Sequence, residues 1–384
     1  MKAMNFKPKT VLEPKQFPND GKNWVIGLDI GYSAVKGISP NKLFSFPSYA
    51  RRIPEGRERM KAYADTDIRY RDKDGIWAVG TLAYDEVVAS EVIDSEEELY
   101  GRNRYYSPMF QVLARTGIAI GLLTNEFGSP KGQKISVQTG LPPKYRTKDT
   151  PILKEILAEK YEFGIQIGNG PWQNFSFTLH EDDIYVMPQP LGALISASID
   201  KEGNQLPIAE QYFSKNVIVF DPGFGTMDDY NVKMGNVVGT GETFNNLGMH
   251  EVFERTCKDI SDIYGVHLLV PELINKLEKG TIYRTERRKM SRVEESFEKF
   301  LFDNSRKVCE EAIEKMKVLH DYFSDTDYII ATGGTYAAWQ KIFDSKFSQM
   351  EGLNIVPANI NDVTLSNVFS NVRGYYFFLF NRLK

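Results

Sequence analysis

One stretch, VIVFDPGFGTMDD at 217–229, limits the possible folds of this chain more than any other. It begins with four apolar residues that are typical of a short buried strand. Asp221 follows the strand directly, and Gly223, Gly225 and Thr226 come next. Glycines let backbone N–H groups approach phosphate oxygens, which a Cβ atom would obstruct, and a carboxylate holds magnesium through the waters that the ion retains. The stretch therefore predicts a strand that ends in a magnesium–phosphate loop.

The same pattern occurs earlier, in VIGLDIGYSAVKG at 25–37. Here an apolar strand ends at Asp29, and Gly31, Ser33 and Lys36 follow. One copy alone is compatible with an ordinary β-turn, because D-x-G is a common turn sequence. Two copies, each after an apolar strand and before a second strand-like run, predict two similar half-domains that bind one triphosphate between them. Lys36 would then offset part of the phosphate charge.

A third element, YIIATGGTY at 328–336, is an apolar strand that runs into Gly333 and Gly334 and then into a helix-like segment. At such a junction the backbone can pass flat against a nucleotide, with a helix N-terminus behind it. Together the three segments resemble the phosphate-1, phosphate-2 and adenosine motifs of the actin, sugar-kinase and heat-shock-chaperone ATPase superfamily.

Signals in the first half of the chain narrow this resemblance. They are the first D-x-G loop, a V-G-x-x-A run at 79–83, a tyrosine-rich helix at 105–123, and a strand that ends in T-G-L-P-P at 139–143. In this order they are similar to the N-terminal domain of bacterial plasmid-segregation actins of the ParM/StbA type. The resemblance implies an α/β, actin-like (ribonuclease H-like) fold with two α/β domains that flank a nucleotide cleft. The expected division is a flexible extension (1–22), domain I (23–205 plus 356–384) and domain II (206–355).

The resemblance also implies roles for individual residues. Asp29, Asp221 and Gln189 would be catalytic: the two carboxylates would hold Mg²⁺ largely through water, and Gln189, at the start of a helix, would orient the attacking water. Segregation actins usually have glutamate at this helix start, and the simpler interpretation of Gln189 is a polar helix-start residue. Tyr32 and Phe224 depart from the usual small residues of the loops. The expected nucleotide-binding residues are Gly31, Tyr32, Ser33, Lys36, Gly223, Phe224, Gly225, Thr226, Gly248, Gly333, Gly334, Thr335 and Tyr336.

Composition excludes several other classes of protein. A net charge of −4 over 384 residues gives no reason to expect direct nucleic-acid binding. The two cysteines and four histidines form no metal-ligand spacing, and so few cysteines favour a reducing, cytoplasmic location. The N-terminus lacks the features of a signal peptide, and the apolar runs are shorter than the roughly 20 residues of a membrane helix. A membrane partner is therefore not expected.

The resemblance implies an ATPase, with ATP or GTP and Mg²⁺ as cofactors. It would assemble with itself into filaments that segregate plasmid or phage DNA through a DNA-binding adaptor protein at a centromere-like site. Three alternatives stay open: a sugar or acetate kinase, for which no catalytic carboxylate is evident; a chaperone ATPase, which would need a following peptide-binding domain; and a membrane-tethered shape or division actin. Only the aromatic C-terminal segment, 361–384, could anchor the last of these.

Patterns elsewhere predict local structure. The aromatic C-terminal segment is expected to form a helix that packs in the core. A helix is also expected over 154–161, and the charged segment 271–324 is expected to be helical throughout. Residues 51–71 have few apolar positions and no clear period, so they are expected to form a surface loop.

Overall fold

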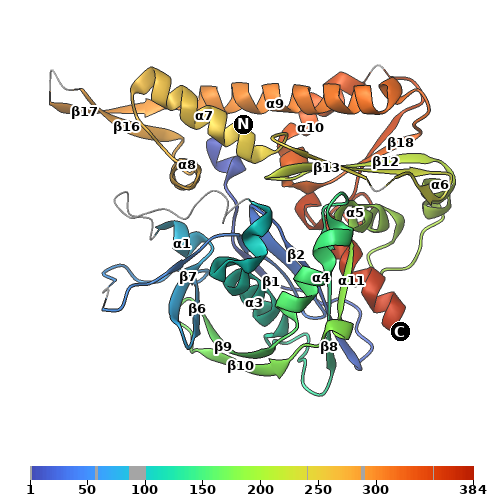
Figure 1. The fold of residues 1–384 in the computed structure, drawn as a ribbon, viewed down its shortest axis with the longest axis horizontal. Coiled ribbons are helices and arrows are strands. Elements are labelled where there is room, and N and C mark those ends of the chain that lie inside the picture. The colour runs from blue at the N-terminus through green and yellow to red at the C-terminus, as the bar shows by residue number, and fades with distance from the viewer. Residues whose placement is uncertain (1, 57–58, 86–100, 240, 287–289, 349) are drawn as a thin grey trace.

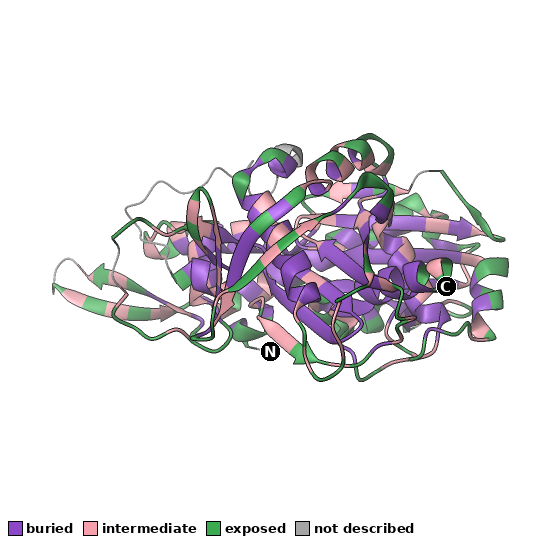
Figure 2. Cartoon of the chain, turned by 90° about the horizontal axis from the view of Figure 1, so that it is seen from below, coloured by how far each residue is buried: buried purple, intermediate pink, exposed green. Residues whose placement is uncertain are grey.

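The structure of the protein is a computed structural model that describes the chain except for residues 1, 57–58, 86–100, 240, 287–289 and 349. Two layered α/β halves lie one above the other in Figure 1. Helices α5 (Gln189–Ser198) and α11 (Ser370–Leu383) lie where the two halves meet. Figure 2 shows that buried residues concentrate in the central strands of both halves.

The main sheet of the lower half has the strand order β1-β4-β3-β2-β8-β11. Strands β2, β8 and β11 run parallel, whereas β2, β3, β4 and β1 form an antiparallel series. Helix α3 (Pro108–Leu122) and helix α11 pack on β2 from opposite faces, because Leu28 contacts α3 whereas its neighbour Gly27 contacts α11. The strand bounds are Val11–Pro14 (β1), Asn23–Ile30 (β2), Ala34–Ser39 (β3), Lys42–Pro47 (β4), Lys134–Leu141 (β8) and Ile184–Pro188 (β11).

A second sheet of the lower half has the order β10-β9-β6-β7-β5. The segment 51–71, expected to be a loop, supplies two of its strands, while residues 57–58 lie outside the described chain. The sequence IRYRD alternates with a period of two, so Ile68 and Tyr70 share one face and are fully buried. The bounds are Ala50–Arg52 (β5), Ile68–Asp72 (β6), Gly75–Val79 (β7), Lys160–Ile167 (β9) and Gln173–Thr178 (β10), with α1 at Thr81–Asp85 and α4 at Arg146–Leu157. Helix α4 thus ends before most of the helix expected at 154–161.

The sheet of the upper half repeats the topology around β2. Strand β12 runs antiparallel to β13 and parallel to β18, just as β2 runs antiparallel to β3 and parallel to β8. The strands are β12 (Asn216–Pro222), β13 (Thr226–Lys233), β14 (Asn236–Val237), β15 (Glu242–Asn245), β18 (Tyr328–Ala331) and β19 (Asn354–Pro357). The helices are α6 (Ile208–Ser214), α7 (Met249–Tyr264), α8 (Val270–Lys276), α9 (Glu298–Leu319) and α10 (Gly333–Phe347). The similarity of the two halves, expected from the repeated loop, is present in the structure.

The charged segment 271–324 is only partly helical. Strands β16 (Thr281–Glu286) and β17 (Ser291–Ser296) form a hairpin that projects at one end of the molecule (Figure 1). Its side chains pair across the strands, because Arg284 lies 2.8 Å from Glu295 and the Arg292 guanidinium lies 3.8 Å from the centre of the Tyr283 ring. Cross-strand pairs of this kind stabilise a hairpin even where the sequence is rich in charged residues. Residues 287–289, within the predicted helix, lie outside the described chain.

The N-terminal residues also differ from the expected flexible extension. Strand β1 pairs with β4 at the edge of the lower main sheet. Before it, the Ala3 amide donates to Glu298 on α9 at 2.8 Å, and the Phe6 ring lies 6.0 Å from that of Phe302. Phe17 packs on the ring of Tyr376. The segment therefore touches both halves of the molecule. A short edge strand and a few buried apolar residues order it, which its proline and lysine content does not indicate.

The C-terminal helix packs in the core, as expected. In α11, Tyr375, Tyr376 and Leu379 are fully buried. Among the described residues, the structure has no helix that is both long enough and apolar enough to cross a membrane.

Candidate functional site

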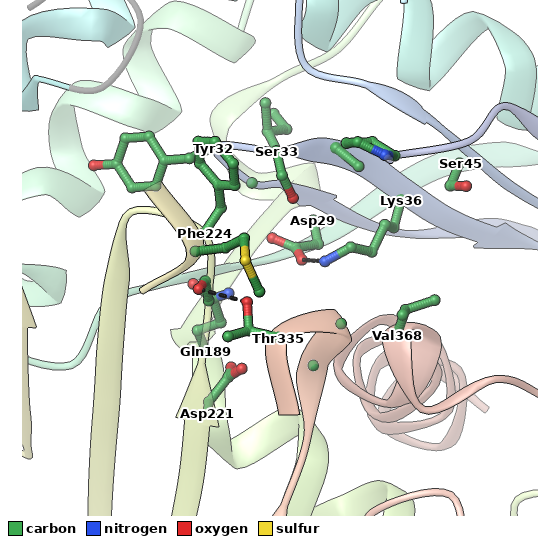
Figure 3. A pocket seen from close by; sticks show the side chains of 18 of the residues that line it. Asp29, Tyr32, Ser33, Lys36, Ser45, Gln189, Asp221, Phe224, Thr335 and Val368 are labelled. Atoms are coloured by element: carbon green, nitrogen blue, oxygen red, sulfur yellow. Dashed lines mark hydrogen bonds and ion pairs between the residues drawn. The ribbon is translucent and has the colours of Figure 1, made fainter. Parts of the chain in front are cut away.

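A cavity of about 500 Å³ lies between the two halves. Its walls come from the β2–β3 turn, the β12–β13 turn and the N-terminal ends of α5 and α10, and Asn5–Lys9 of the N-terminal segment also contribute. Figure 3 shows the side chains that line it. Pockets of this size hold small molecules and cofactors.

The lower wall presents an ion pair. Asp29 at the end of β2 and Lys36 on β3 are cross-strand partners, and the Lys36 Nζ lies 3.1 Å from the Asp29 Oδ2 (Figure 3). Burial by itself would lower the pKa of Lys36, but the carboxylates of Asp29 and Asp221 raise it above its ordinary value. The Ser48 hydroxyl donates to the Gly31 carbonyl at 2.6 Å and so stabilises the turn. Lys36 thus remains a cation inside the cavity.

The upper wall has the same hairpin with different chemistry. Asp221 at the end of β12 faces Asp228 across the strands, in the place that Lys36 takes opposite Asp29. Burial raises the pKa of Asp221 to about 6, against the opposing effects of a hydrogen bond from Asn371 and the charge of Lys36. Burial and the nearby Asp221 raise the pKa of Asp228 well above its usual range, although the Thr243 hydroxyl donates to it at 2.7 Å.

These carboxylates fit a hydrated divalent cation. Asp29, Asp221 and Asp228 are all buried at the cavity, and Lys36 is paired with Asp29, whereas Asp221 and Asp228 face each other. A metal ion would offset the repulsion between the facing carboxylates, and carboxylate oxygens are suitable ligands for Mg²⁺. In the described part of the chain, no three histidine, cysteine or acidic side chains are grouped closely enough to hold a metal ion. The donor set therefore fits an ion that keeps most of its waters.

The two aromatic residues of the loops contribute to the walls. A Cβ atom on Gly225 would lie 3.0 Å from the Tyr32 ring, so the glycine allows the first loop to approach the second closely. The Arg104 guanidinium lies 4.3 Å from the centre of the same ring and also donates to the Ile30 carbonyl. Phe224 packs edge-on against Phe253 of α7. Tyr32 therefore joins the two loops through its ring.

The strand–Gly-Gly–helix junction lies at the upper wall. Gly333 has φ +89°, and a Cβ atom there would lie 3.0 Å from the Asp221 Oδ1. The Thr335 hydroxyl donates to the Gly223 carbonyl at 2.8 Å, and this bond connects α10 to the β12–β13 turn. Both the conformation and the close approach require glycine at position 333.

Three of the predicted nucleotide-binding residues lie behind the cavity wall. The Tyr336 side chain is buried and packs on Phe343 within the upper core, because it lies on the inner face of α10. Gly248 lies against the loop backbone: a Cβ atom there would be 2.3 Å from the Phe224 carbonyl oxygen. Gly225 is covered by Tyr32. The predicted residues that do line the cavity are Asp29, Gly31, Tyr32, Ser33, Lys36, Gln189, Asp221, Gly223, Phe224, Thr226, Gly333, Gly334 and Thr335.

Sequence reasoning missed Asp228, Arg104 and Asn371. A signal for Asp228 existed, because it follows Asp221 at the same spacing at which Lys36 follows Asp29. Asn371 was expected only as part of a C-terminal helix, and its side-chain amide donates to Asp221 at 2.7 Å from far along the chain.

Comparisons with known proteins give matches to actin-like proteins. A sequence model described as the N-terminal domain of actin-like proteins matches residues 27–192. A comparison with curated protein sequences gives no match. Similar solved structures include a non-polymerisable quadruple mutant of pCBH ParM, with 23% identity, a TM-score of 0.69, and coverage of 93% of this chain and 99% of that one. They also include a 15-stranded ParM filament from Clostridium botulinum (20% identity, TM-score 0.66, coverage 93% and 99%) and an archaeal actin homologue, Ta0583 (16%, 0.63, 94% and 99%). The chain therefore has the actin-like fold of these ParM structures, and its residues 27–192 match the N-terminal domain of actin-like proteins.

Proposed function

We propose that the chain binds ATP, or GTP, together with Mg²⁺ in the cavity between its halves and hydrolyses the terminal phosphate. The observation that supports this most directly is the pair of equivalent hairpins, β2–β3 and β12–β13. They bring Asp29 with Lys36 and Asp221 with Asp228 to the walls of a single cavity. A polyphosphate between the hairpins would contact both halves at once.

Each group at the cavity then has a defined task. Backbone N–H groups of the turns at Gly31 and Gly223 would bind phosphate oxygens, and Lys36 would offset their charge. Asp29 and Asp221 would hold the hydrated metal ion, which when bound neutralises charge that develops on the phosphates. Gln189, at the first turn of α5, would orient a water molecule toward the terminal phosphate.

We further propose that nucleotide binding drives assembly of the chain with itself into filaments. The support is the likeness in fold to structures that include a ParM filament. Domain I (23–205 plus 356–384) and domain II (206–355) would close on the nucleotide and reopen after hydrolysis. The filaments would segregate plasmid or phage DNA in the cytoplasm through a DNA-binding adaptor at a centromere-like site, because the net charge of −4 does not favour direct contact.

The test measures phosphate release and light scattering on one sample of purified protein with Mg²⁺ and ATP or GTP. Scattering should rise on addition of nucleotide and fall as phosphate is released. Asp221→Ala should remain folded and lose Mg²⁺-dependent binding and hydrolysis, whereas the exposed α9 variant Lys307→Ala should behave like the parent. A protein that consumes ATP yet never scatters would be a phosphotransferase rather than a filament protein. Unchanged turnover in Asp221→Ala would contradict the assignment of the site.

A further inference from the structure

The C-terminal helix α11 contacts the elements that hold all three predicted catalytic residues. It packs on β2, which carries Asp29 next to its last residue, and on α5, which begins with Gln189. The approach to α5 is close, because Gly374 of α11 lies directly against the backbone of Gly192. The contact with the third residue, Asp221, is made by a side chain of α11.

That side chain is Asn371. Its Nδ2 donates to the Asp221 Oδ2 at 2.7 Å, and both residues are buried. An ionised carboxylate only accepts hydrogen bonds, so the amide must present its NH₂ group to Asp221. The Thr332 hydroxyl lies 3.5 Å from the Asn371 Oδ1 on the other side and favours the same orientation. One carboxylate oxygen of Asp221 is thus held by Asn371, and its other oxygen, Oδ1, lies against Gly333 at the cavity wall.

One turn further along the same face of α11 lies Tyr375. Its hydroxyl is 3.4 Å from the carbonyl oxygen of Gln189, and its side chain is fully buried. Residues four apart share one face of a helix. This face therefore contacts Asp221 through Asn371 and the start of α5 through Tyr375.

Arg373 holds the opposite end of α5. Its Nη1 donates to the Ser196 carbonyl at 2.6 Å, and its Nη2 donates to the carbonyls of Ile199 and Asp200. The last carbonyls of a helix have no partner within the helix and carry partial negative charge, so a buried guanidinium suits this position. The C-terminal helix thus contacts both ends of α5 as well as Asp221.

We propose that Asn371 is a positioning residue that holds the Asp221 carboxylate in the orientation needed to bind the hydrated metal ion and its nucleotide. This inference rests on the proposed function of the cavity. Asn371 acts through Asp221 and contacts no phosphate itself. Hydrogen-bond partners behind a metal-binding group typically change metal affinity or activity by about 10–100-fold when they are removed.

The test compares Asn371→Leu with Asn381→Leu, a change on the same helix whose side chain donates to the Gly203 carbonyl away from the cavity. Equilibrium binding of a fluorescent ADP analogue is measured with chelator and across a Mg²⁺ titration, together with KM and kcat for ATP. In Asn371→Leu the Mg²⁺ concentration for half-maximal binding should rise by about 10-fold or more, with little change in metal-free affinity. Asn381→Leu should leave both quantities unchanged, even if its unfolding temperature falls.

A second variant, Asn371→Ser, changes the side-chain volume less than leucine does. It keeps the test valid if the leucine variant does not fold. A folded variant with the Mg²⁺ dependence of the parent would overturn the inference, because Asn371 would then serve stability alone. If the parent itself bound no nucleotide, the proposed function would fail and the inference with it. The two failures are therefore distinguishable.

Discussion

Replacing Gly374 with alanine should separate the two central helices. A Cβ atom at this position would lie 1.9 Å from the carbonyl oxygen of Gly192 and 2.6 Å from its carbonyl carbon. Both atoms belong to the backbone of α5, so no side-chain rotation can relieve the overlap. Reaching the shortest distance that real Cβ atoms show, 3.0 Å, requires a shift of about 1.1 Å between α5 and α11.

The shift has consequences for both stability and the site. Overpacking of this kind costs about 1–3 kcal/mol, and each kcal/mol lowers the unfolding midpoint of a chain of 384 residues by roughly 1 °C. Moving α11 by the same amount would stretch the 2.7 Å bond from Asn371 to Asp221 beyond hydrogen-bonding distance. Hydrolysis should therefore fall at temperatures where the variant is still fully folded.

Calorimetry and phosphate release on the same preparation measure both effects. Lys307→Ala, an exposed position on α9, serves as the control and should match the parent. A Gly374→Ala variant with the parent's unfolding midpoint and hydrolysis rate would refute the reasoning, because it would show that the helices accommodate the extra atom without moving the site.

Three further predictions concern other parts of the molecule. Gln189→Ala should leave ATP binding nearly intact and slow hydrolysis by roughly 100-fold, so that filaments persist; phosphate release and scattering that both decay at the parent rate would make Gln189 structural. Deletion of residues 2–9 removes a wall of the cavity and the contact between Phe6 and Phe302, so a fluorescent nucleotide should dissociate faster in stopped-flow experiments, and an unchanged rate would contradict this. Burial lowers the pKa of Lys42 from 10.5 to about 8. Between these two pH values the unfolded state binds this proton more than the folded state does, so the free energy of unfolding should rise by about 3 kcal/mol as the pH increases. Urea unfolding of Lys42→Met across the same pH range should lack that rise.

Features that depend on neighbouring residues were predictable from the sequence. An apolar run followed by Asp-x-Gly specifies a strand and the turn after it, because glycine and aspartate favour turn conformations locally. A serine followed by proline favours the start of a helix, and at the start of α3 the Ser107 hydroxyl accepts a hydrogen bond from the Phe110 amide at 3.1 Å. The repeat of the first loop in the second predicted that the two halves are alike, since similar local sequences fold into similar hairpins.

Other features were decided only when the chain folded. Tyr336 and Thr335 are neighbours, yet one enters the core and the other lines the cavity, because packing of α10 on β12 selects which face is buried. The hairpin at 281–296 depends on cross-strand pairs that a charge-rich sequence does not reveal. Asn371 meets Asp221 only because α11 returns to the boundary between the two halves, and Gly192 and Gly374 allow that approach. Sequence thus determined the two loops and their charged residues, whereas contacts between distant segments determined how those residues are held.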